Sequence, residues 1–169
     1  MCTSDSSTGN SCTYVSLKQK IPAYSKNAFT ISLGTREYIE LGERLKSIIA
    51  SSITVSPKEI SELLQYVNPG KDKSFPSPAI DSQLKMVLLS TSLLTSPNYT
   101  GPPFELLIAR FYINELNFAT KEIADALNKM DIERAYRAWE FGRDSWNSYF
   151  IIINKAIVPK VGDKFDLIA

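Results

Sequence analysis

The sequence predicts an all-α protein, an up-and-down four-helix bundle with one additional short helix and an extended N-terminal arm. Large apolar residues recur every three or four positions over long stretches, which is the spacing of a buried helix face. Clusters of proline, glycine and serine separate these stretches, and the sequence offers no set of strands for a sheet. Helices of this kind bury their apolar stripes against one another in a bundle.

The composition is that of an ordinary globular domain. The chain has 169 residues, of which 44% are hydrophobic and 22% charged, and its formal net charge is +1. Such a balance creates no strong field that would attract nucleic acid, so no nucleic-acid partner is expected. No apolar run reaches the roughly 18 residues that a bilayer-spanning helix needs, so we expect no transmembrane segment.

Residues 1–34 are predicted to form an extended arm and residues 35–169 the helical bundle domain. The arm begins with a stretch rich in serine, threonine and glycine, and its later apolar residues show no sustained helical period. Lys18, Lys20 and Lys26 make it locally basic, so they are candidate docking residues for a larger partner. The alternative is an arm that packs along its own bundle.

The first two helices are predicted from capping signals. Thr35 can cap a helix over residues 35–51. The sequence Ser56-Pro57-Lys58-Glu59 predicts the start of a short second helix, because serine caps, proline suits the first turn and glutamate completes a capping box. Asn68 begins the segment that ends this helix.

The third and fourth helices are predicted from Ser77-Pro78, which opens a helix, and from the break over residues 96–103. The fourth helix is expected over residues 102–129. The largest apolar side chains define the predicted inner face of each. They are Ile80, Leu84, Val87, Leu88, Thr91 and Leu94 in the third helix, and Phe104, Leu107, Ile108, Phe111, Leu116, Ala119, Ile123, Ala126, Leu127 and Met130 in the fourth.

The fifth helix, over residues 131–158, has the strongest apolar stripe. Its members are Ile132, Ala135, Trp139, Gly142, Trp146, Tyr149, Phe150, Ile153 and Ile157. The short turn before Asp131, a plausible cap, favours an antiparallel hairpin with the fourth helix. Gly142 is unusual, because a mid-helix glycine costs about 1 kcal/mol relative to alanine, and a close helix approach or the edge of a pigment-sized ligand would explain it. Phe165 and Leu167 or Ile168 are expected to fold back onto the bundle.

Residue types needed for catalysis are missing from the sequence. The chain has no histidine, which removes the commonest general base and the Glu-x-x-His pairs of di-metal bundles. Cys2 and Cys12 are too few for a structural zinc site, and they form either a disulfide or two free thiols. We therefore predict no enzymatic activity, no catalytic or metal-binding residue and no cofactor.

Charged and aromatic residues off the stripe of residues 131–158 are the remaining candidates for a site. Arg137 can pair with Glu133 four residues before it, and Arg143 also lies mostly away from the stripe. Tyr136, Arg137 and Arg143 are therefore candidate partner-docking residues. The alternative is a solvated helix face that binds no partner.

The last two predicted helices and the segment that follows them resemble a known family. The residues that carry the resemblance are Ala135-Tyr136-Arg137-Ala138-Trp139, then Gly142-Arg143-Asp144-Ser145-Trp146-Asn147-Ser148-Tyr149-Phe150 and Lys160-Val161-Gly162-Asp163-Lys164-Phe165. Together with the predicted bundle and arm, they resemble the PsbQ-like extrinsic photosystem subunits, especially the four-helix photosystem II extrinsic protein of diatoms and other red-lineage algae.

This resemblance implies a role in photosynthesis, in the chloroplast. It implies a non-catalytic extrinsic subunit in the thylakoid lumen, peripheral to the membrane, that docks on the lumenal side of photosystem II through protein–protein interaction with core or antenna subunits. Such subunits stabilise the complex and oxygen evolution. Two alternatives remain open: a linker between a photosystem core and its antenna, and a helical module that binds a small hydrophobic ligand or a peptide.

Overall fold

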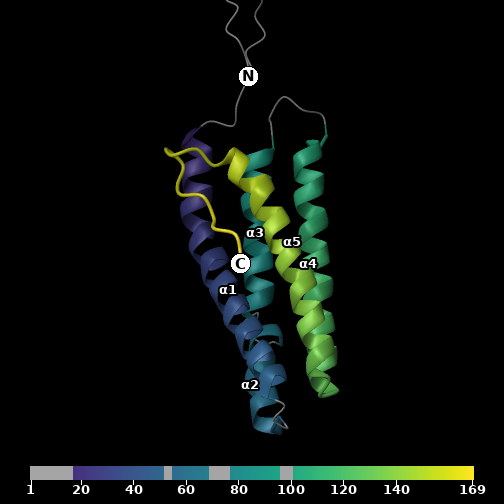
Figure 1. Cartoon of the computed structure of the whole chain (residues 1–169). Coiled ribbons are helices and arrows are strands. Elements are labelled where there is room, and N and C mark those ends of the chain that lie inside the picture. The colour runs from purple at the N-terminus through teal and green to yellow at the C-terminus, as the bar shows by residue number, and fades with distance from the viewer. Residues whose placement is uncertain (1–16, 52–54, 69–76, 96–100) are drawn as a thin grey trace, which may run out of the picture.

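Five helices pack along one another in the computed structural model, which describes residues 17–51, 55–68, 77–95 and 101–169 (Figure 1). In chain order they are α1 (Leu17–Ser51), α2 (Pro57–Val67), α3 (Pro78–Leu94), α4 (Phe104–Asn128) and α5 (Ile132–Ala156). The four long helices form the up-and-down bundle, and α2 lies at one end of it. The described residues contain no strand. The predicted fold class, a four-helix bundle with one additional short helix, is confirmed.

The predicted start of the first helix is wrong, because α1 begins at Leu17 and runs through Gly34 and Thr35. Residues 17–34 of the predicted extended arm are therefore helical, while residues 1–16, with Cys2 and Cys12, lie outside the described residues. Thr35 does not cap a helix, since its hydroxyl donates to the Ile31 carbonyl within α1.

The physical reason for this error is the inner face of the first half of α1. That face carries small or polar residues together with Ile31, namely Asn27, Ala28, Ile31 and Gly34. Large apolar residues such as Phe29 and Leu33 point outward. The apolar period that identifies a buried helix face is therefore obscured.

Local capping chemistry is as predicted at the next two helix starts. The Ser56 hydroxyl accepts from the Glu59 amide and the Glu59 carboxylate accepts from the Ser56 amide, which completes the capping box of α2. Ser77 caps α3 with Pro78 in the first turn, and Asn68 is the C-cap of α2. These signals are read correctly from sequence because each depends on residues within three or four positions.

A short turn joins α4 to α5 in an antiparallel hairpin. Met130 adopts a φ of 57°, and Asp131 caps α5 by accepting from the Arg134 amide at 3.0 Å. The predicted stripe of α5 is the buried face, from Ala135 to Ile153, with Ile157 buried just beyond the helix. The hairpin and this face are therefore confirmed.

The predicted inner faces of α3 and of the first half of α4 are wrong. On α3, Ile80, Leu84 and Leu88 point outward, and the buried side instead includes Ser82, Gln83, Met86, Leu89, Ser90 and Leu93. On α4, the exposed residues include Phe104, Leu107 and Phe111, whereas Leu106, Ala109 and Ile113 are buried. Both helices are apolar on two sides, so the largest side chains do not identify the core. In the second half of α4, Leu116 to Leu127 lie as predicted, while Met130 is exposed.

The C-terminal tail returns along α1 after α5 ends (Figure 1). The Asn154 side chain exchanges two hydrogen bonds with the Phe165 backbone, at 2.8 and 2.9 Å. Asn147, one heptad earlier on α5, does the same with Ile168. Phe165 and Ile168 are buried, as predicted, and Leu167 is exposed.

Candidate docking surface

The three candidate lysines lie on the first turns of α1 rather than on an extended arm. Lys18 and Lys26 are exposed, and Lys20 is partly buried. Residues two positions apart on a helix point to nearly opposite sides, so Lys18 and Lys20 do not share a face. The structure therefore does not gather the three lysines into one basic patch.

Tyr136 and Arg143 lie together, because both contact Trp139 between α5 and α1. The Tyr136 ring stacks on the Trp139 ring with centroids 5.5 Å apart and planes 17° apart. The Arg143 guanidinium lies 5.6 Å from the Trp139 ring centroid, a cation–π contact, and donates to Asp144 at 3.2 Å. On the α1 side, Tyr38 stacks on the same indole at 5.7 Å.

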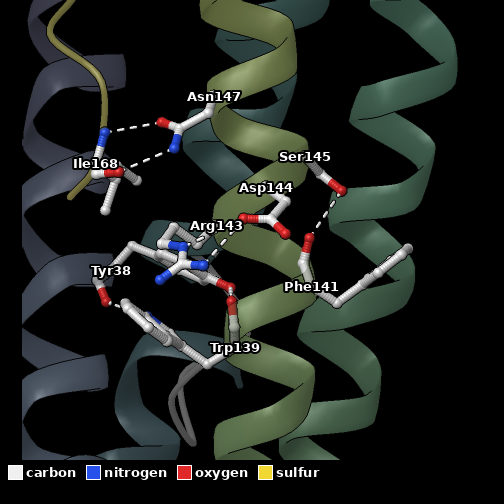
Figure 2. Close-up of polar contacts among 8 residues, drawn as sticks. All are labelled: Tyr38, Trp139, Phe141, Arg143, Asp144, Ser145, Asn147 and Ile168. Carbon is white, nitrogen blue, oxygen red and sulfur yellow. Dashed lines mark hydrogen bonds and ion pairs between the residues drawn. The ribbon is translucent and has the colours of Figure 1, made fainter.

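Reciprocal hydrogen bonds join Trp139 to Tyr38 (Figure 2). The Trp139 indole Nε1 donates to the Tyr38 carbonyl at 2.8 Å, and the Tyr38 hydroxyl donates to the Trp139 carbonyl at 2.7 Å. Burial raises the pKa of Tyr38 well above its usual range, with the nearby Tyr66 adding to the shift, so its hydroxyl stays a neutral donor. This arrangement fixes one helix on the other and is better suited to holding the fold than to proton transfer.

Two glycines make room for this contact. A Cβ on Gly42 of α1 would overlap the Trp139 ring, and a Cβ on Gly142 of α5 would overlap the Tyr38 hydroxyl and approach the Ala119 Cβ. Of the two explanations for Gly142, a close helix approach is therefore the one that applies. Tyr38 occupies the space beside Gly142 that the edge of a ligand would need.

Arg137 lies on a different side of α5, facing solvent near α4. It pairs with Glu133 at 3.8 Å, as predicted, in a strongly exposed ion pair. Arg137 also lines an open groove whose other lining residues are Phe118, Ala119, Glu122, Arg134, Ala138 and Phe141. In Figure 2 the Phe141 side chain points away from the Tyr38–Trp139 pair, toward α4. The three candidate residues of α5 thus belong to two separate surfaces.

An ion-pair network includes two of the residues that line this groove, Glu122 and Arg134. Arg134 reaches the Glu122 carboxylate at 2.6 Å and the Asp125 carboxylate at 3.0 Å, and Lys129 also reaches Asp125, at 2.8 Å. The hydrogen bond from Lys129 is the main cause of a lowered pKa at Asp125, with Arg134 contributing. These charges neutralise one another across the α4–α5 hairpin.

Two rows of exposed apolar side chains form the rest of the candidate surface. The α3 row consists of Ile80, Leu84 and Leu88. The α4 row consists of Phe104, Leu107, Phe111 and Phe118. Exposed apolar side chains in a row along one helix face are a candidate interaction site. The sequence pattern predicts a core position for the α3 row and for most of the α4 row, and the structure exposes them. The sequence signal for such rows is a second set of apolar residues at helical spacing on a helix that already has one apolar face.

The described residues show neither a metal site nor a membrane span. Within the described ranges no three cysteine, aspartate or glutamate residues gather as ligands. No helix among the described residues is both long enough and apolar enough to traverse a bilayer.

Comparison with known proteins gives no relative. No protein-family model matches the chain, and neither a curated protein nor a solved structure matches it.

Proposed function

We propose that this protein is a non-catalytic subunit that docks on the lumenal side of photosystem II in the chloroplast thylakoid and stabilises that complex. The observation that carries a docking role is the α3 row, whose three side chains point into solvent on the face away from the core. The resemblance of residues 135–150 and 160–165 to the PsbQ-like subunits supplies the identity of the assembly.

The chemistry of the described residues is consistent with a structural role. The buried tyrosine hydroxyls each donate to a backbone carbonyl, Tyr38 to Trp139, Tyr66 to Gly34 and Tyr149 to Met86. Burial raises the pKa of all three tyrosines, so they remain protonated and hold helices together. The filled space beside Gly142 gives no support to a ligand in the core.

A pull-down from detergent-solubilised thylakoid membranes, with the full chain as bait and mass spectrometry as readout, tests the proposal. We expect photosystem II subunits to be recovered. A Leu84→Asp variant, changed in the α3 row, should lose them. Leu167→Asp is the matched control, because Leu167 on the tail is 54% exposed and Leu84 is 51% exposed. Its recovery should equal that of the unchanged protein.

The alternatives give different results in the same experiment. Antenna subunits recovered together with a photosystem core would favour the linker function. Bound lipid or pigment without any photosystem subunit would favour the ligand-binding module. Recovery of no photosystem subunit overturns the proposal.

A further inference from the structure

The α4 row has the spacing of a coiled-coil seam. Phe104, Phe111 and Phe118 are each seven residues apart, and Leu107 lies between the first two. Their side chains are 72%, 55% and 63% exposed, and Leu107 is 48% exposed. In the seven-residue coiled-coil repeat, labelled a to g, the three phenylalanines occupy position a and Leu107 occupies position d. Apolar residues at these two positions form the face that packs against another helix. The row points away from the bundle core, so its partner must come from outside this chain's described helices.

Charged residues lie on both sides of the seam. Arg110 precedes Phe111 at a g position, and Glu115 follows it at an e position. Neither takes part in the ion pairs of the described residues. Oppositely charged g and e residues beside an apolar seam are the groups that form ion pairs between helices and set their orientation.

The order of these two charges along α4 is complementary to that of a second α4 helix, from another copy of the chain, that runs parallel to the first. In a parallel pair, the g residue of one helix faces the e residue five positions further along the other. Arg110 of each copy then faces Glu115 of the other copy, twice by symmetry. In an antiparallel pair, position e of one helix instead faces position e of the other. The two Glu115 side chains would then lie along the same edge of the seam, where like charges repel.

A polar residue in the seam favours the same register. Asn114 is exposed at the d position between Phe111 and Phe118. In a parallel pair in register, residues at position d face each other, so each Asn114 amide can hydrogen-bond its counterpart, whereas an antiparallel pair would set it against a position-a residue such as phenylalanine. Lys121 and Asp125 follow at the next d and a positions, so the apolar seam ends after Phe118.

We propose that a second copy of this chain docks on the α4 row, forming a two-fold dimer with parallel α4 helices and reciprocal Arg110–Glu115 ion pairs. The seam spans two heptads, about 21 Å of helix. An interface of this length is smaller than that of most permanent dimers, so association should be reversible and depend on concentration. The dimer is independent of the proposed docking function, which uses the α3 row.

Sedimentation velocity of the full chain, over about a hundredfold range of concentration, tests the dimer. We expect the mass to rise from 18.9 kDa toward twice that value. Phe111→Glu should weaken association by about 100-fold or more, because two buried charges would meet at the centre of the seam. Phe29→Glu is the matched control, since Phe29 on α1 is 76% exposed and lies off the seam. Its association should be unchanged.

A charge exchange tests the parallel orientation. Arg110→Glu should weaken association by about tenfold, and adding Glu115→Arg should restore it. Far-ultraviolet circular dichroism and urea unfolding of each variant would establish that the bundle is intact. A single species of 18.9 kDa at every concentration overturns the proposal, even if Phe111→Glu lowers photosystem recovery, since the row would then bind that partner instead. A dimer that resists Phe111→Glu, or one that the charge exchange leaves weakened, also overturns it.

Discussion

The two tryptophans of α5 lie one heptad apart, and both are buried, but the contacts that hold them differ. Trp139 donates a hydrogen bond to α1, stacks on both Tyr38 and Tyr136, and fits against Gly42. Trp146 is fully buried against Phe150, with ring centroids 5.3 Å apart, and its Nε1 has no hydrogen-bond partner among the described residues.

The two tryptophans therefore contribute differently to the same face of α5: Trp139 fixes the register of the helices, and Trp146 fills space. The directional contacts of Trp139 allow one register of α1 on α5, because a shift along either helix breaks the hydrogen bonds and moves the ring off the glycine. Trp146 supplies apolar volume, which is compatible with more than one arrangement of its neighbours. The fit of Trp139 is therefore specified by hydrogen bonds and a close approach to α1, and that of Trp146 by packing.

The largest effect should come from filling the space in which Trp139 lies. Gly42→Ala adds a methyl group that overlaps the indole, and we expect a loss of about 2 kcal/mol or more, net of the helix-propensity gain. Urea unfolding measures the change. Gly101→Ala is the control, because no atom lies within 4 Å of the added group, and it should be near neutral. A neutral Gly42→Ala variant would show that Trp139 does not lie against α1.

The second comparison exchanges each tryptophan for phenylalanine. Both variants lose similar ring volume, but only Trp139→Phe also loses a hydrogen bond. We expect Trp139→Phe to be more destabilising than Trp146→Phe by about 1 kcal/mol, the net value of a typical hydrogen bond. Equal losses, measured by urea unfolding at the same pH, would contradict the division between the two sites.

A smaller effect is expected at the edge of the Trp139 site. Arg143→Gln removes the cation over the indole ring and should lower the free energy of unfolding by about 0.5 to 1 kcal/mol. Arg137→Gln is the control, because the ion pair that Arg137 forms among the described residues is exposed and 3.8 Å long, and its loss should be close to zero. If the two variants behave alike, the contact between Arg143 and Trp139 contributes nothing to stability.

The sequence predicts the parts of this molecule that depend on neighbouring residues. The caps at Ser56, Ser77 and Asp131 and the stripe of α5 follow from local chemistry and a single apolar period. The first half of α1 and the inner face of α3 do not follow, because their core positions hold residues such as Asn27 and Ser82 while larger side chains face outward.

The candidate surface is predictable only in part for a related reason. The sequence groups Tyr136, Arg137 and Arg143 as candidate docking residues, whereas the structure joins only Tyr136 and Arg143, through Trp139. The hydrogen bonds that fix Trp139 link residues 101 positions apart. No local pattern identifies that pairing. Its traces in the sequence are two mid-helix glycines, Gly42 and Gly142, which leave room for the Trp139 ring and the Tyr38 hydroxyl.

The smallest expected effect is a pH dependence beside Tyr38. Burial raises the pKa of the Glu37 carboxyl above its usual range, and Glu40 adds to the shift, while its Oε2 has no hydrogen-bond partner among the described residues. Between the unfolded pKa of about 4.3 and the raised folded value, the folded state binds more protons, so this group's contribution to stability falls as pH rises through that window.

Glu37→Gln removes that titration and should therefore be more stable than the unchanged protein at neutral pH. The difference should vanish below a pH of about 4, where Glu37 is protonated in both states. Glu43→Gln, the same change at an exposed position on α1, controls for the general effect of removing one negative charge. Urea unfolding across this pH range measures both variants. A Glu37→Gln variant that is less stable at neutral pH would mean that the carboxylate has a favourable partner, and the pH dependence of this group's contribution would then have the opposite sign.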